Sequence, residues 1–108
     1  MFIKSNLRNY KIEFGYKIKN SIIKNSNNIF LIDKNVYKKF NFKKYNIKKR
    51  ILITPTEKAK DFLFLKNIIN QILKLKVSRQ STLVAIGGGI VQDITSFLSS
   101  ILFRGITW

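Results

Sequence analysis

Three consecutive glycines, Gly87 to Gly89, stand between an apolar run and a segment with helical spacing. The run before them, residues 82–86, has the length and composition of a buried β-strand. After them, apolar side chains follow at the spacing of one helix face: Ile90, Ile94, Phe97, Leu98 and Ile101. A strand joined to a helix by a glycine turn is typical of a parallel α/β sheet, so this segment restricts the fold class most.

Other segments have strand patterns too. Residues 10–15 alternate apolar and polar side chains, which predicts a half-exposed strand, whereas residues 29–32 are a continuous apolar run typical of a strand buried on both faces. Residues 50–53 predict the next strand, and residues 106–108 the opening of one more. Strands that alternate with helices indicate βαβ units. We therefore predict an α/β fold, a Rossmann-like and mostly parallel sheet with flanking helices, in one domain over residues 1–108.

Segments whose apolar residues have helical spacing lie between these strands. The pattern predicts short helices around residues 18–23 and 36–40, a basic connector over residues 41–50, and a last helix that ends near Gly105. Thr54, Pro55 and Glu57 have the pattern of a capping box, with Thr54 as the cap. This pattern predicts that a helix starts at Pro55 and continues to about residue 75.

The residue types that are absent exclude several kinds of chemistry. The 108 residues include no Cys and no His, which excludes disulfides, a thiol nucleophile, a His general base and a Cys/His metal site. The net charge of +16 suggests a nucleic-acid or membrane-surface binder. However, the chain is rich in Ile, Lys and Asn and has only 2 Ala, as expected when AT-rich codons determine residue choice. We interpret the charge as a solvated surface.

Residues 82–103 form a stretch long enough to span a membrane. Asp93 lies near its centre, where a carboxylate costs roughly 2.5–3.5 kcal/mol on insertion. A buried strand followed by an amphipathic helix explains the same residues without that cost. The N-terminus has no long apolar run of the kind found in signal peptides. We predict a cytoplasmic protein without a membrane segment.

Several residues are placed either for a ligand or for local structure. Glycines before a helix let a phosphate approach the backbone and the free N–H groups, but the spacing is not GxGxxG, and a tight turn explains it equally well. Asp33 and Asn35 follow the carboxyl end of a strand, where a ligand site and a helix cap are both expected. Asp93, one turn into the last helix, could bond a nucleotide ribose or amide, or simply stabilise the helix N-terminus.

Three further charged residues have similarly plain explanations. Glu57 belongs to the capping box, and Lys60 follows it at the spacing of an ion pair along a helix. Arg104 lies near a helix C-terminus, where a positive charge is favourable. None of these residues indicates a function alone.

In this order and spacing, the residues resemble the N-terminal domain of 3-dehydroquinate synthase and its sugar-phosphate cyclase relatives. Residues 32–36, 57–60 and above all 83–106 carry the match, with Val-Ala-Ile-Gly-Gly-Gly-Ile-Val-Gln-Asp followed by Phe97 and Phe-Arg-Gly-Ile. The resemblance spans about residues 10–108. Thr56 and Gln92 stand where the family usually has Gly, and Gln92 leaves the cyclase subgroup open.

The resemblance implies the NAD-binding part of an enzyme. By similarity, the residues on the adenosine side of NAD are Asp33, Asn35, Glu57 and Lys60, those on its pyrophosphate are Gly88, Gly89 and Ile90, and Asp93 holds the nicotinamide ribose region. Arg104 corresponds to the family arginine that binds the substrate phosphate, in some members across a dimer interface, a role that suits a guanidinium group.

The family reaction is part of the shikimate pathway of aromatic amino acid biosynthesis. It converts a seven-carbon keto sugar acid phosphate into 3-dehydroquinate by transient oxidation with NAD, loss of phosphate, re-reduction and ring closure. It also needs a divalent metal, zinc or cobalt, held by one carboxylate and two histidines in a C-terminal helical domain. The resemblance thus implies a homodimeric lyase whose catalytic and metal-binding residues lie outside this chain, and no turnover by the chain alone.

Other interpretations stay open. One is a cyclase of surface-sugar biosynthesis, or a polyol or alcohol dehydrogenase of the same superfamily, although Arg104 argues against a substrate without phosphate. Another is a small nucleic-acid-binding module, because lysines and aromatic residues are interleaved between Tyr37 and Tyr45. No pattern of a known nucleic-acid-binding motif accompanies them, so we expect no nucleic-acid partner.

Overall fold

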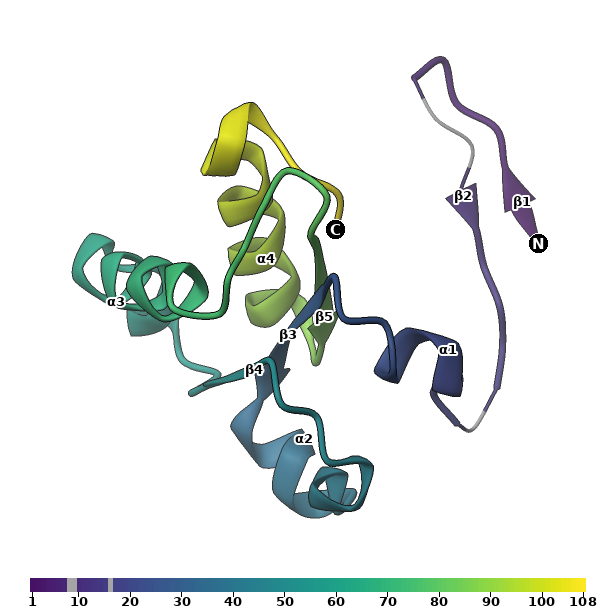
Figure 1. The fold of residues 1–108 in the computed structure, drawn as a ribbon, viewed down its shortest axis with the longest axis horizontal. Helices are drawn as coiled ribbons and strands as arrows, with labels where there is room; N and C mark the ends of the chain where they lie inside the picture. The colour runs from purple at the N-terminus through teal and green to yellow at the C-terminus, as the bar shows by residue number, and fades with distance from the viewer. Residues whose placement is uncertain (8–9, 16) are drawn as a thin grey trace.

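A parallel three-stranded sheet forms the centre of the computed structural model, which describes residues 1–7, 10–15 and 17–108 (Figure 1). The strands are β4 (Arg50–Ile53), β3 (Asn28–Asp33) and β5 (Thr82–Ile86), in that order across the sheet. Phe30 lies opposite Arg50 in β4 and Val84 in β5. Thr107 extends the sheet beyond β5 through a single parallel bridge to Thr82. The predicted parallel sheet is confirmed.

Helices cover both faces of this sheet. Ile29 and Leu31 of β3 pack on the side of α3 (Phe62–Leu73) and α4 (Gly89–Ile101). Phe30 and Ile32 pack on the opposite side, which carries α1 (Asn20–Ile23), α2 (Lys34–Lys39) and the 3-10 turn η1 (Phe42–Tyr45). All residues of β3 are buried, as the continuous apolar run predicts. The crossover from β3 to β4 and the crossover from β4 to β5 run in opposite directions across the sheet, so right-handed connections place α2 and α3 on opposite faces.

The predicted strand at residues 10–15 is mostly wrong. Only β2 (Tyr10–Lys11) forms there, and it pairs antiparallel with β1 (Phe2–Ile3). This hairpin lies to one side of the three-layer body in Figure 1, and the side chains of Phe2 and Tyr10 are exposed. The alternating pattern has no layer to pack against, so little regular structure forms. Glu13, just after β2, pairs with Lys11 and Lys19, and their ammonium groups lower its pKa to about 2.

The predicted helix start at Pro55 is also wrong. Residues Glu57–Lys60 form a 3-10 turn, η2, and α3 begins only at Phe62, after an extended Asp61. In the described part of the chain, no side chain caps either element. Ala59 of η2 is buried in the core formed with α3 and α4. This packing outweighs a local capping signal of about 1 kcal/mol.

Two other boundaries differ from the prediction. The basic connector at residues 41–50 contains η1, and its Phe42 and Ile47 are buried among lysines whose spacing shows no period. The last helix, α4, ends at Ile101, and the 3-10 turn η3 (Leu102–Arg104) follows. Gly105 then closes the turn with a φ of 110°, which explains the glycine at this position. Among the described residues, no helix is long and apolar enough to cross a membrane.

Candidate functional site

The carboxyl ends of β3 and β5 meet where the order of the strands reverses. The chain passes from β3 to β4 on one side and later reaches β5 on the other side. Open α/β sheets bind ligands in the crevice at such a point. Asp33 ends β3 and Gly87 follows β5, and the two are in close contact, because a Cβ on Gly87 would lie 2.9 Å from the Cβ of Asp33. This edge of the sheet is therefore the candidate site.

The glycine turn has one glycine that the fold requires and two that it does not. Gly87 has a φ of +153° and no space for a side chain, whereas a Cβ on Gly88 or Gly89 would meet nothing within 4 Å. Among the residues that the structure describes, no side chain caps α4, so the N–H groups of its first turn have no cap partner there. The turn thus presents an open backbone surface at a helix N-terminus, which suits an anion.

A small pocket of about 100 Å³ lies at this turn. Its lining residues are Asp33, Pro55, Gly88, Gly89, Ile90 and Val91. The structure therefore brings together four of the residues assigned to NAD by resemblance, from the ends of two strands. The sequence pattern did not indicate that Pro55 lines the site. Its position just after the carboxyl end of β4 is the signal that could have indicated it.

Asp33 is a helix cap. Its Oδ1 accepts hydrogen bonds from the backbone N–H groups of Asn35, at 2.7 Å, and Val36, at 3.2 Å. The capping interpretation is confirmed. Asn35 does not line the pocket, and its side chain is exposed. Oδ2 of Asp33 has no partner among the described residues. It remains available as an acceptor at the edge of the pocket.

We expect Asp33→Ala to lower the free energy of unfolding by about 1–2 kcal/mol, because two N–H groups of α2 lose their acceptor. Asp33→Asn keeps an acceptor oxygen and should retain most of the stability. Urea unfolding of both variants measures the difference. Equal losses in the two variants would show that the charge, and not the cap, is what stabilises this end of the sheet.

A second group of charges lies further along α4. Lys60 of η2 donates to Asp93 at 2.8 Å and lies 3.7 Å from Glu57. The hydrogen bond to Asp93 raises the pKa of Lys60. Lys60 and Asp93 line a largely apolar pocket of about 370 Å³ together with Leu65, Ile94 and Phe97. The ion pair predicted between Glu57 and Lys60 is confirmed, but its partner Asp93, distant in the sequence, makes the shorter contact.

Gln92 has a role that the sequence pattern did not show. Its side-chain Nε2 donates to the backbone carbonyl of Gly87 at 3.2 Å. This bond ties the first turn of α4 to the glycine turn. At the sequence level Gln92 was only a departure from the usual Gly, and a side-chain conformation cannot be derived from that.

Arg104 does not join these groups within the chain. It lies after the C-terminal end of α4, and a helix of 13 residues spans roughly 20 Å at about 1.5 Å per residue. Thr107 bridges Thr82 at the start of β5, so Arg104 lies near the amino edge of the sheet. Phe103 and Arg104 have left-handed backbones, with φ of 48° and 63°. The predicted phosphate ligand is thus remote from the glycine turn.

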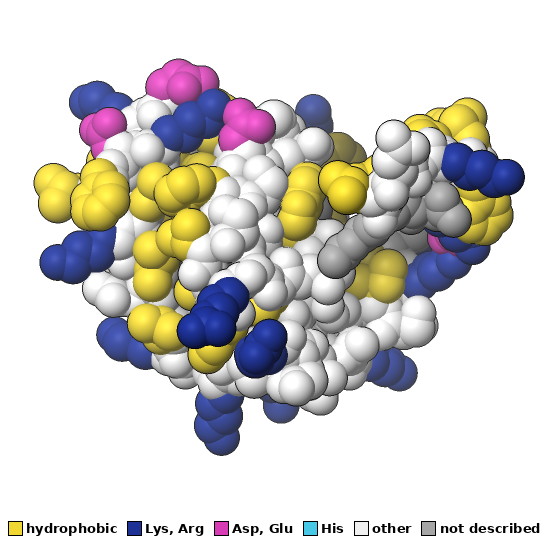
Figure 2. All heavy atoms as spheres, turned by 90° about the horizontal axis from the view of Figure 1, so that it is seen from above, with side chains coloured by type: hydrophobic (Ala, Val, Ile, Leu, Met, Phe, Trp, Pro, Cys, Tyr) yellow, Lys and Arg dark blue, Asp and Glu magenta, His cyan; other side chains and the backbone are white. Residues whose placement is uncertain are grey.

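The charges are unevenly distributed. In the view of Figure 2, Lys and Arg side chains are scattered over the surface, whereas most of the visible carboxylates gather in one region. Within residues 1–7, 10–15 and 17–108, no group of three or more Asp and Glu side chains is placed to hold a metal ion.

The model of one protein family, the N-terminal domain of 3-dehydroquinate synthase, matches residues 50–108. The chain belongs to this family. A 3-dehydroquinate synthase of Picrophilus torridus is 42% identical over 79 residues, which cover 73% of the chain and 23% of the relative. A 3-dehydroquinate synthase of Clostridium perfringens is 41% identical over 58 residues, covering 54% of the chain and 17% of the relative. The resemblance seen in the sequence is confirmed.

The fold of this family member also matches a solved structure. A crystal structure of 2-deoxy-scyllo-inosose synthase aligns with a TM-score of 0.61 and 22% identity, covering 73% of the chain and 24% of that structure. This likeness supports the α/β fold. The chain spans less than a quarter of the length of each of these proteins.

Proposed function

We propose that this family member is the cofactor-binding part of a 3-dehydroquinate synthase-like enzyme and that it binds NAD at the carboxyl edge of its sheet. One observation carries the proposal. Gly88 and Gly89 leave open space beside an uncapped helix N-terminus, at the point where the strand order reverses. None of the described residues fills the space that side chains at these positions would take, which suits the close approach of a pyrophosphate.

The polar groups around the turn fit the rest of a dinucleotide. Oδ2 of Asp33 is an acceptor for a hydroxyl group on the adenosine side, near Asn35. Lys60, held between Asp93 and Glu57, provides a positive charge next to an apolar pocket. Ile90 packs at the pyrophosphate, and Asp93 can accept from the nicotinamide ribose region. These assignments follow the family resemblance.

NAD, when bound, supplies a hydride acceptor that also returns the hydride. In the complete enzyme we propose the family reaction, loss of phosphate and ring closure of a seven-carbon keto sugar acid phosphate, with a divalent metal held outside this chain. Arg104 would bind the substrate phosphate from another surface, which agrees with its distance from the glycine turn and with a homodimer. A sugar-phosphate cyclase of another pathway is the second candidate, favoured by the fold match to 2-deoxy-scyllo-inosose synthase.

A titration of the chain with NAD tests the proposal. We expect the backbone amide NMR signals of residues 87–93 and of Lys60 to shift saturably. Lys60→Gln should weaken binding about two- to fivefold, the range for one exposed ion pair. Lys66→Gln, on the exposed side of α3, removes the same charge outside the site and should change little. No response to NAD, together with RNA binding that persists near physiological salt, would overturn the proposal in favour of a nucleic-acid module.

A further inference from the structure

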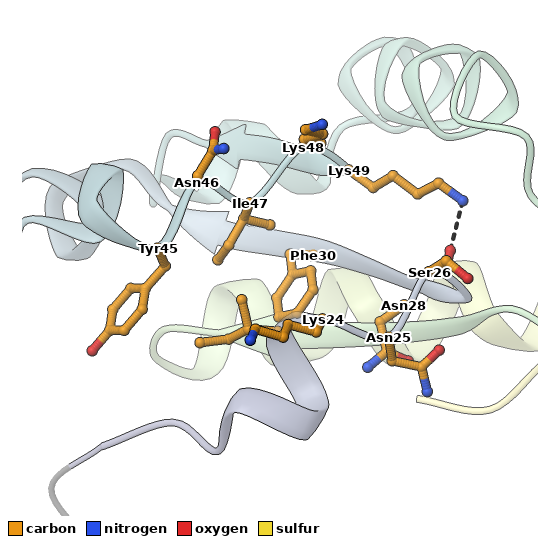
Figure 3. A pocket seen from close by; sticks show the side chains of 11 residues that line it. Lys24, Asn25, Ser26, Asn28, Phe30, Tyr45, Asn46, Ile47, Lys48 and Lys49 are labelled. Carbon is orange, nitrogen blue, oxygen red and sulfur yellow. Dashed lines mark hydrogen bonds between the residues drawn. The ribbon is translucent and has the colours of Figure 1, made fainter.

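A third pocket lies at the amino edge of the sheet, opposite the glycine turn. It has a volume of about 360 Å³ and lies between the end of α1 with its following loop and residues 45–49 (Figure 3). Phe30 and Ile47, both almost fully buried, form its apolar floor. Ligand pockets typically have volumes of roughly 300–1,000 Å³, so a small molecule fits here.

Hydrogen bonds hold the walls of this pocket in place. The side chain of Asn28 donates to the carbonyl of Ile22 at 2.9 Å and so fixes α1 to the start of β3. Lys49 Nζ donates to the carbonyl of Ser26 at 2.7 Å across the rim, as the dashed line in Figure 3 shows. Arg50 donates to the carbonyl of Ile47 at 2.7 Å. The cavity is therefore preformed rather than created by a ligand.

The charged residues that line the pocket are all basic. Lys24 and Lys48 line it, and neither has a carboxylate partner among the described residues. None of the lining residues is acidic. The acidic side chains lie elsewhere. Glu13 pairs with Lys11 and Lys19. The other acidic side chains lie in segments at or after the carboxyl ends of the strands or in the first turns of α4. The pocket thus combines an apolar floor with unpaired ammonium groups.

We propose that this pocket binds a small organic anion with a planar apolar body, at a site separate from the cofactor site. The planar body packs on Phe30 and Ile47, and the phosphate or carboxylate group pairs with Lys24 and Lys48. Figure 3 shows Lys24 extending across the space from α1, next to Phe30. A neutral molecule of the same shape lacks the charge contacts and binds more weakly.

Phenyl phosphate and benzoate are the anionic probes, and benzyl alcohol is the neutral one. We expect the amide signals of residues 23–30 and 45–49 to shift with both anions, and addition of saturating NAD to leave these shifts in place. The double variant Lys24→Gln/Lys48→Gln should lose about three- to tenfold in affinity, as expected for two exposed ion pairs. Lys66→Gln/Lys74→Gln removes the same charge from exposed positions of α3 and its end, and should stay within about twofold.

Each result decides the proposal. A preference for phenyl phosphate over benzoate, or the reverse, identifies the anionic group. Either preference supports the site. Benzyl alcohol binding as tightly as the anions, equal losses in the two double variants, or shifts confined to residues 87–93 would overturn it. The NAD response of residues 87–93 is read from the same spectra, so failure of the cofactor proposal is seen separately.

Discussion

Gly87→Ala is expected to lower the free energy of unfolding by about 1–3 kcal/mol, the range for a non-glycine residue held in a disfavoured backbone conformation. Gly87 has a φ of +153°, and a Cβ there would lie 2.9 Å from Asp33 Cβ and 3.0 Å from Val91 Cγ2. Val91 is fully buried in the core, and the cap of α2 holds Asp33 in place. Neither neighbour can move without disturbing a helix, so the contact is not relieved cheaply.

Gly89→Ala is the matched control, because it adds the same methyl group to open space at the start of α4. Alanine favours a helix more than glycine, so this variant should be as stable as the parent chain or slightly more stable. Urea unfolding followed by circular dichroism compares the two variants. If Gly87→Ala unfolds at the same urea concentration as Gly89→Ala, the close packing between Gly87 and Asp33 does not stabilise the fold.

The central part of the fold could be predicted because its strands are continuous apolar runs, of which β3 is buried on both faces. The continuous apolar runs of β3 and β5 and the helical spacing of α4 depend on local sequence alone. The hairpin of β1 and β2 could not be predicted, because β1, the partner of β2, consists of Phe2–Ile3 and has no strand pattern of its own. The delayed start of α3 could not either, because the burial of Ala59 against α4 is a tertiary contact.

The same distinction applies to the candidate site. Asp33 and the glycine turn could be placed at one edge of the sheet because parallel strands bring their carboxyl ends together. Whether they bind a ligand or only shape the local structure stayed open from the residues alone. The contact between Lys60 and Asp93 joins residues that no local pattern relates. The bond from Gln92 to Gly87 and the placement of Pro55 depend on side-chain and loop conformation. Arg104 was grouped with the others only by resemblance, and the length of α4 separates it from them.

Gly89→Val is expected to reduce the affinity for NAD at least about tenfold without lowering the stability of the chain. Valine and glycine differ by only a few tenths of a kcal/mol in helix propensity, so the fold is little affected. The branched side chain would project into space that the described residues leave empty, next to a pocket of about 100 Å³. If the pyrophosphate lies on this backbone, the valine methyl groups occupy its place. Isothermal titration with NAD measures the loss.

Two comparisons separate steric exclusion from a general effect of the substitution. Gly89→Ala adds less bulk and should lose less affinity than Gly89→Val, so the loss should increase with side-chain size. Gly15→Val adds the same side chain at an open position outside the candidate site and should bind NAD like the parent chain. An unchanged affinity in Gly89→Val would mean that a bound dinucleotide does not approach this turn. The open glycines would then be only a feature of the strand-to-helix connection, and the cofactor site would have to be sought beside Lys60 and Asp93 instead.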